Sequence, residues 1–240
     1  MASTRMRAVI ERVRAGVDRV RAAIPFGHGR TSFAEQGEDL ILDRMFIGQD
    51  RGIYVDVGAH HPRRLSNTHM LYRRGWRGVN IDATPGSMAW FRRLRPRDVN
   101  LELGVTAEAS EREFFVFNEP ALNTFDAARA RSLVRPPYFI KAIHKVPCKP
   151  LSTILREQSI GEIDLLTIDA EGFDYEVLQT VDWTVSRPRV VLTEQHSNDL
   201  AAVMESDVYK FMAARGYRIA AKTHNTVFYA REATYVTRRA

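Results

Sequence analysis

The chain has 240 residues, of which 45% are apolar, 10% aromatic and 27% charged, and its formal net charge is +6. This composition is typical of a globular domain with one large core, which excludes low-complexity disorder, collagen-like repeats and coiled-coil rods. The single cysteine, Cys148, excludes a disulfide scaffold and a cysteine-based metal cage, and it favours a reducing, cytoplasmic location.

The positive charge is concentrated at the N-terminus. Residues 1–30 contain seven arginines against two acidic residues, whereas the other 210 residues carry 28 basic and 27 acidic side chains. A nearly neutral body argues against a nucleic-acid partner, because a phosphate-binding tract normally runs across the catalytic face.

The N-terminal segment has its own periodicity. Apolar residues recur every three or four positions from Met6 to Ile24, which predicts a basic amphipathic helix over residues 1–30. Arginines interrupt every apolar run, so the segment is neither a signal-peptide core nor a transmembrane span. We expect this helix to pack on the body or on a partner subunit of a homodimer; attachment to an anionic membrane surface is the less favoured alternative.

Beyond residue 30, helical segments alternate with short apolar runs over a single predicted domain, 31–232. The predicted helices cover 33–46, 88–94, 151–157, 175–180 and 200–215. The predicted strands cover 52–58, 79–82, 99–105, 113–117, 164–169 and 189–194, with a hairpin from 217–222 to 227–230. Strands separated by helices predict a mostly parallel sheet, to which the hairpin adds one antiparallel strand at or near an edge. The proline-containing segment 118–150 predicts an irregular substrate loop, and residues 233–240 a tail.

The ends of the first two strands carry a cofactor-binding pattern. The first strand ends in Asp56-Val57-Gly58, and the second ends at Asp82, 26 residues after Asp56. A glycine that lets backbone approach a ligand, followed by an acid that accepts ribose hydroxyls, is typical of nucleoside binding at the carboxyl edge of a sheet. We therefore predict Asp56, Gly58 and Asp82 as cofactor contacts, although Asp-x-Gly is also common in structural turns. The three-glycine dinucleotide fingerprint is absent, which favours a cofactor without pyrophosphate, such as S-adenosylmethionine (SAM).

Several short blocks together resemble the FkbM family of SAM-dependent methyltransferases. They occur in the family's order at residues 33–39, 54–59, 66–68, 71–72, 75–82, 164–172 and 192–196. The resemblance implies a class I, Rossmann-like α/β fold: a seven-stranded, mostly parallel sheet with one antiparallel strand and helices on both faces. It also implies O-methylation of a sugar or oligosaccharide hydroxyl, such as that of a mannoside in polysaccharide synthesis.

The resemblance further implies that the amino-acid end of SAM contacts Gln36, Ser66 and Asn67. Ser66 and Asn67 equally suit the N-cap of a helix. The sequence departs from the family where Gly58-Ala59 is followed by His60-His61-Pro62, because many relatives have a small residue and a glycine in that turn.

An alcohol is a poor nucleophile until it loses its proton, so a general base or a metal is needed. Asp169 ends one strand, and Glu194 and His196 end the next, so these three residues are expected to meet at the carboxyl edge. Three interpretations stay open. In the first, the three side chains bind Mg²⁺ or Mn²⁺, and Asp169 also lies beside the cofactor. In the second, His196 is the base and Glu194 orients it, and in the third the carboxylates are structural. In the last case Glu171 or Asp174 would cap the following helix.

His144 lies in the predicted substrate loop and is a further candidate base, against the simpler interpretation of a solvated loop residue. Two other functions remain as alternatives to sugar O-methylation. One is methylation of a nucleic acid or a small molecule, and the other is a non-catalytic, partner-binding module with the same fold. The acidic residues at several strand ends argue against the second, because a lapsed site needs none of them.

Overall fold

The computed structural model describes residues 29–231. The chain divides into two units, Met1–Thr31 and Ser32–Ala240. The amphipathic helix predicted over residues 1–30 and the tail predicted over 233–240 fall outside the described residues, apart from Gly29 and Arg30.

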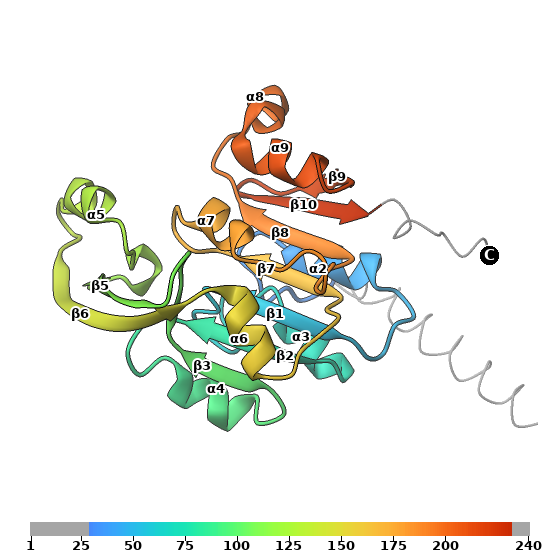
Figure 1. Cartoon of the computed structure of the whole chain (residues 1–240), viewed down its shortest axis with the longest axis horizontal. Helices are drawn as coiled ribbons and strands as arrows, with labels where there is room; N and C mark the ends of the chain where they lie inside the picture. The colour runs from blue at the N-terminus through green and yellow to red at the C-terminus, as the bar shows by residue number, and fades with distance from the viewer. Residues whose placement is uncertain (1–28, 232–240) are drawn as a thin grey trace, which may run out of the picture. The chain divides into compact units, whose positions relative to one another are not determined.

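A seven-stranded sheet forms the centre of the larger unit (Figure 1). Its strand order is β3-β2-β1-β7-β8-β10-β9. The strands are β1 (Ile53–Val57), β2 (Arg77–Asp82), β3 (Val99–Glu102), β7 (Leu165–Ile168), β8 (Val190–Glu194), β9 (Tyr217–Lys222) and β10 (Thr226–Arg231). The pairs from β3 to β8 are parallel, and β10 is antiparallel to both β8 and β9. The predicted fold, a mostly parallel sheet with one reversed strand, is confirmed.

Helices cover both faces of this sheet (Figure 1). They are α2 (Glu38–Met45), α3 (His69–Arg74), α4 (Met88–Leu94), α6 (Leu151–Glu157), α7 (Asp174–Gln179), α8 (Leu200–Glu205) and α9 (Asp207–Ala213). Side chains alternate along β1, so Val55 and Val57 enter the core cluster built with α6, α7 and α9, while Tyr54 enters the cluster built with α2 and α3. Because both faces are covered, the central strands β1 and β7 are buried on both sides and largely apolar. Within residues 29–231, no helix combines the length and the apolar character needed to cross a membrane.

A smaller sheet lies beside the carboxyl edge of the large one. It has the order β4-β6-β5, with β4 (Gly104–Val105), β5 (Ser110–Phe117) and β6 (Ile140–Lys149). Between β5 and β6 the chain forms a 3-10 helix, η1 (Pro120–Leu122), and the helix α5 (Ala127–Leu133). We call residues 110–149 the β5–β6 unit.

The structure differs from the sequence-based prediction in four places. The predicted strand 99–105 is two strands, β3 and β4, which belong to different sheets. Segment 118–150 is not irregular, because it contains η1, α5 and the whole of β6, whose alternation of apolar residues is interrupted by His144 and Pro147. The predicted helix 200–215 is two helices, since Ser206 ends α8 and its hydroxyl accepts a hydrogen bond from the Tyr209 N–H to cap α9 (3.1 Å). The helix α3 was not predicted.

Candidate active site

A cavity of about 340 Å³ lies at the carboxyl edge of the large sheet, and the β5–β6 unit forms its opposite wall. The strand ends contribute Gly58, Asp82, Asp169 and Glu194 to the lining. The β5–β6 unit contributes Phe114, the segment 120–125 and Arg129. This volume falls within the ~300–1,000 Å³ that small-molecule sites occupy.

Gly58 and Asp82 lie where the sequence predicts them, on the cavity wall. Gly58 has φ +78°, and a Cβ on it would lie 1.8 Å from the carbonyl oxygen of Asp169, so only glycine fits where β1 passes the end of β7. The Asp82 carboxylate accepts one backbone hydrogen bond on each oxygen, from the His60 N–H (2.8 Å) and the Thr84 N–H (2.7 Å). Each oxygen keeps a free lone pair, so the carboxylate is fixed in place and still able to accept from a ligand hydroxyl.

Asn67 also lines the cavity, and its side-chain amide donates to the hydroxyl of Thr167 (3.1 Å). Ser66 does not line it: its buried hydroxyl accepts from the Arg95 guanidinium (2.7 Å) and from the His69 N–H at the start of α3 (3.2 Å). The N-cap of α3 is Thr68, but Ser66 does bind the first N–H of this helix, while the cofactor contact of Asn67 stays a prediction.

Asp56 and Gln36 are likewise absent from the lining. Asp56 is inside β1, on the opposite face from Val57, and its buried carboxylate accepts from the Thr68 hydroxyl (2.6 Å). Burial raises the pKa of Asp56 to about 6. The Gln36 side chain accepts from the Asn225 N–H (2.9 Å) and so braces the β9–β10 turn. The prediction that these two side chains contact the cofactor is not supported by their positions.

Three carboxylates meet at the other end of the cavity. Asp169 and Glu171 follow β7, Glu194 ends β8, and one carboxylate oxygen from each lies within 4.8 Å of the others. Asp169 is exposed to the cavity, and the atoms of the cavity walls surround it closely. This loss of solvation, together with the neighbouring Glu194 and Asp174, raises the pKa of Asp169 well above its usual range. For the same reasons, burial first and then Glu171 and Asp174, the pKa of Glu194 is raised to about 8.

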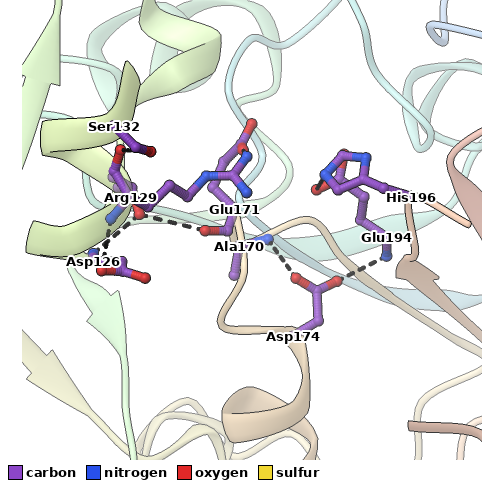
Figure 2. A network of polar contacts seen from close by, with 9 residues as sticks. Asp126, Arg129, Ser132, Ala170, Glu171, Asp174, Glu194 and His196 are labelled. Atoms are coloured by element: carbon purple, nitrogen blue, oxygen red, sulfur yellow. Dashed lines mark hydrogen bonds and ion pairs between the residues drawn. The ribbon is translucent and has the colours of Figure 1, made fainter. Parts of the chain in front are cut away.

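Glu171 replaces His196 as the third member of this group. His196 is exposed and lies 3.3 Å from the Glu194 carboxylate through Nε2, so it lines the cavity beside the group (Figure 2). Glu171 has φ +50°, a conformation rare for a residue with a side chain, and its carboxylate pairs with Arg129 of α5 (Figure 2). The sequence analysis offered Glu171 as a helix cap, and Arg129 was not predicted at all, because it lies on α5 in the β5–β6 unit, far from Glu171 in sequence.

His144 does not belong to the site. It is exposed on β6, where it is paired with Phe114 of β5, and it does not line the cavity. The solvated position expected as the simpler interpretation is the one observed. His60, by contrast, lines the cavity with φ +53°, a backbone conformation that favours glycine.

The residues present fit SAM. Gly58 lies on the cavity wall, and Asp82 has acceptors for ribose hydroxyls. Six carboxylate side chains and one arginine line the cavity, which favours a cationic sulfonium over an anionic ligand. The lining carboxylates are Glu35, Glu38, Asp82, Asp169, Glu171 and Glu194.

A seven-stranded sheet with one reversed strand, and a cavity at its carboxyl edge, define the class I SAM-dependent methyltransferase fold. The chain belongs to the FkbM methyltransferase family: the model of the Methyltransferase FkbM domain matches residues 56–219.

Three solved structures that are similar to the chain are distant from it in sequence. A methyltransferase FkbM from Methylobacillus flagellatus is 11% identical with a TM-score of 0.49 over 88% of this chain; the chain spans about half, 47%, of that structure. An O-methyltransferase from Bacillus cereus in complex with SAH is 14% identical with a TM-score of 0.45 over 90% of both chains. A TehB-like SAM-dependent methyltransferase from Corynebacterium glutamicum is 10% identical with a TM-score of 0.42, over 94% of this chain and 100% of that one. No curated protein matches the chain.

Proposed function

We propose that the chain transfers a methyl group from SAM to a hydroxyl of a sugar or oligosaccharide, such as a mannoside in polysaccharide synthesis. The observation that carries this proposal is the placement of two chemistries in one cavity. Asp82 and Gly58 suit the nucleoside of SAM, and the three carboxylates at the ends of β7 and β8 suit a hydroxyl that must lose its proton.

SAM, when bound, supplies an electrophilic methyl group, so the protein's task is to orient the acceptor and to take its proton. Asp82 holds the ribose, and Gly58 lies beside the cofactor on the cavity wall. Glu194 is a candidate proton acceptor in the cavity, because burial and its carboxylate neighbours raise its pKa to about 8 and so make its ionised form a stronger base than an ordinary carboxylate. His196, 3.3 Å from Glu194, can pass that proton towards solvent.

A divalent cation is the second part of the proposal. Three carboxylate oxygens within 4.8 Å of one another form a donor set that Mg²⁺ and Mn²⁺ prefer. Asp169, Glu171 and Glu194 would hold the ion, with His196 beside them, and the ion would lower the pKa of an acceptor hydroxyl. The Arg129 guanidinium pairs with Glu171 and so places one positive charge beside the three carboxylates.

The test begins with calorimetric titration of S-adenosylhomocysteine (SAH) into the full chain, in EDTA and then in added Mg²⁺ or Mn²⁺. Transfer of labelled methyl groups to methyl mannoside and to mannose oligosaccharides follows under the same conditions. Micromolar SAH binding and sugar labelling are expected, with labelling lost in EDTA and restored by the ion. Labelling that is unchanged by EDTA would contradict the metal and support removal of the proton by a protein base. No SAH binding under any condition would contradict the proposed function.

A further inference from the structure

The parallel strands β7 and β8 separate just where the site begins. Their last paired residues are Ile168 and Thr193. Beyond them, the N–H of Asp169 donates to the Val57 carbonyl of β1 (2.9 Å), and Glu194 is paired with Thr226 of β10. The carboxylates that follow β7 are therefore tied to one side of the sheet, and Glu194 is tied to the other.

One buried side chain spans this gap. Asp174, the first residue of α7, is only 5% exposed. Its Oδ2 accepts from the N–H of Ala170 (3.1 Å), and its Oδ1 accepts from the N–H of Glu194 (2.8 Å), as Figure 2 shows. A carboxylate has acceptors on both oxygens and no donor, so it suits two converging N–H groups. Asp174 thus bridges the two strand ends through backbone on each side.

The two backbone groups that Asp174 binds belong to the catalytic segment itself. Ala170 lies between Asp169 and Glu171, and the other donor is the main chain of Glu194. Within the described residues, no other side chain is hydrogen-bonded to backbone groups of both segments. The spacing of the three carboxylates, with oxygens within 4.8 Å, therefore depends on where Asp174 holds these two chains.

From this geometry we propose that Asp174 is a positioning residue. It sets the distance that separates Asp169 and Glu171, which follow β7, from Glu194 at the end of β8. The inference rests on the proposed function, because it assigns these carboxylates to the reacting hydroxyl or its cation. Asp174 does not line the cavity and touches no bound molecule; it acts only through the backbone of the two strand ends.

The decisive variant is Asp174→Asn, which keeps the size of the side chain but turns an NH₂ group towards one of the two N–H donors. At least one of the amides of Ala170 and Glu194 then loses its acceptor. We expect its hydrogen exchange, followed by NMR, to become about tenfold faster or more. We also expect kcat for methyl transfer to fall by about tenfold or more, since small displacements of catalytic groups are costly, while SAH affinity stays within about twofold.

Asp182→Asn is the matched control. Asp182 is exposed, and its carboxylate also accepts a backbone hydrogen bond, from Thr184 (3.0 Å), but far from the cavity lining. Asp182→Asn should leave kcat and the hydrogen exchange of the Ala170 and Glu194 amides unchanged. Asp174→Glu keeps both acceptors on a longer side chain, so it tests the spacing if the Asn variant does not fold; it should retain the fold with a lowered kcat.

Unchanged exchange at both amides in Asp174→Asn would overturn the proposal, as would full kcat per folded molecule in either Asp174 variant. Failure of the proposed function has a different signature, in which the unmodified chain neither binds SAH nor labels a sugar. In that case the exchange measurement still decides whether Asp174 holds the two strand ends.

Discussion

Asp82 is the residue on which cofactor binding depends most directly. Its two carboxylate oxygens are fixed by the His60 and Thr84 N–H groups and face the cavity. Asp82→Asn replaces one acceptor by a donor and removes the charge. Because a hydrogen bond to a charged group contributes about 1.5–3 kcal/mol, we expect SAH affinity to fall by about tenfold to a hundredfold, measured by calorimetry.

The matched control for Asp82 is Asp199→Asn. Asp199 also accepts from an N–H two residues ahead, that of Ala201 (2.9 Å), but it is exposed and outside the cavity lining. SAH affinity should match that of the unmodified chain. Equal affinities for the Asp82 and Asp199 variants would remove Asp82 from the cofactor site.

His69 makes the stability of the folded chain depend on pH. It is 8% exposed, and burial, followed by the cationic Arg95 and Arg63, lowers its pKa from 6.5 to about 4. The unfolded chain therefore binds a proton below pH 6.5 that the folded chain refuses until about pH 4, so stability falls as the pH drops through this window. The loss amounts to at most about 3 kcal/mol.

His69→Gln removes this titration and keeps a donor in its place. Urea unfolding at pH 7 and pH 4.5 should show a smaller loss of stability in the variant than in the unmodified chain. Asp56 changes stability in the opposite direction, because its raised pKa of about 6 favours the folded state as the pH falls. The difference between the two chains isolates His69, and identical pH dependence in both would contradict the assignment.

Among the elements, the loop from β1 to α3 depends on one buried cation. Arg95, at the end of α4, is fully buried. Its guanidinium donates to the Pro62 carbonyl (2.7 and 2.9 Å), to the Ser66 hydroxyl (2.7 Å) and to the Thr68 hydroxyl (2.7 Å). Thr68 in turn donates to Asp56 (2.6 Å), so the positive and negative groups are joined through one hydroxyl.

Arg95→Met should therefore be strongly destabilising. It removes the positive charge that offsets the buried carboxylate of Asp56 and leaves the Pro62 carbonyl without its donor, and breaking a buried pair costs about 3–5 kcal/mol. Urea unfolding at pH 7 measures this. Arg97→Met is the control, since the exposed Arg97 lies over the Tyr72 ring at 4.1 Å and its loss should cost under about 1 kcal/mol. Equal losses in the two variants would show that the Arg95 network does not stabilise the loop.

Element by element, the sequence predicted best where one period dominates. The uniformly buried β7 and the amphipathic α4 and α6 were recognised, and α4 and α6 have the predicted bounds. The strand β6 was missed because exposed Ile143 and His144 and two flanking prolines break its alternation. The polar hydrogen bonds that end α8 at Ser206 have no periodic signal.

The residues of the candidate site were also predicted only in part. Gly58, Asp82, Asp169 and Glu194 were predictable because parallel strands end together at one edge. Asp56 was misplaced because it lies inside β1 on the face opposite Val57, which lines the cavity, and its carboxylate accepts from the Thr68 hydroxyl. Arg129 could not be predicted from local patterns, since it reaches Glu171 only through the packing of two sheets.

At the scale of the whole molecule, the cavity joins parts of the chain that are far apart in sequence. Its wall includes the ends of β1, β2, β7 and β8 and the β5–β6 unit. These two sheets are linked by few polar contacts, such as Asn123 to Thr84 (3.0 Å) and Arg112 to Glu176 (3.3 Å). A ligand in the cavity therefore binds only when both sheets are folded, and its binding energy adds to the stability of both.

SAH should raise the melting temperature of the full chain by mass action. At a concentration 100 times its Kd, a ligand that binds only the folded state adds about 2.7 kcal/mol, which shifts the melting temperature of a domain of this size by roughly 5–11 °C. Thermal unfolding with increasing SAH measures the shift, and Asp82→Asn at the same concentrations should move the curve to higher SAH. A single transition that shifts as a whole indicates that the β5–β6 unit and the large sheet unfold together. A second transition insensitive to SAH would instead show that the β5–β6 unit melts on its own, and that the wall opposite the strand ends contributes nothing to cofactor binding.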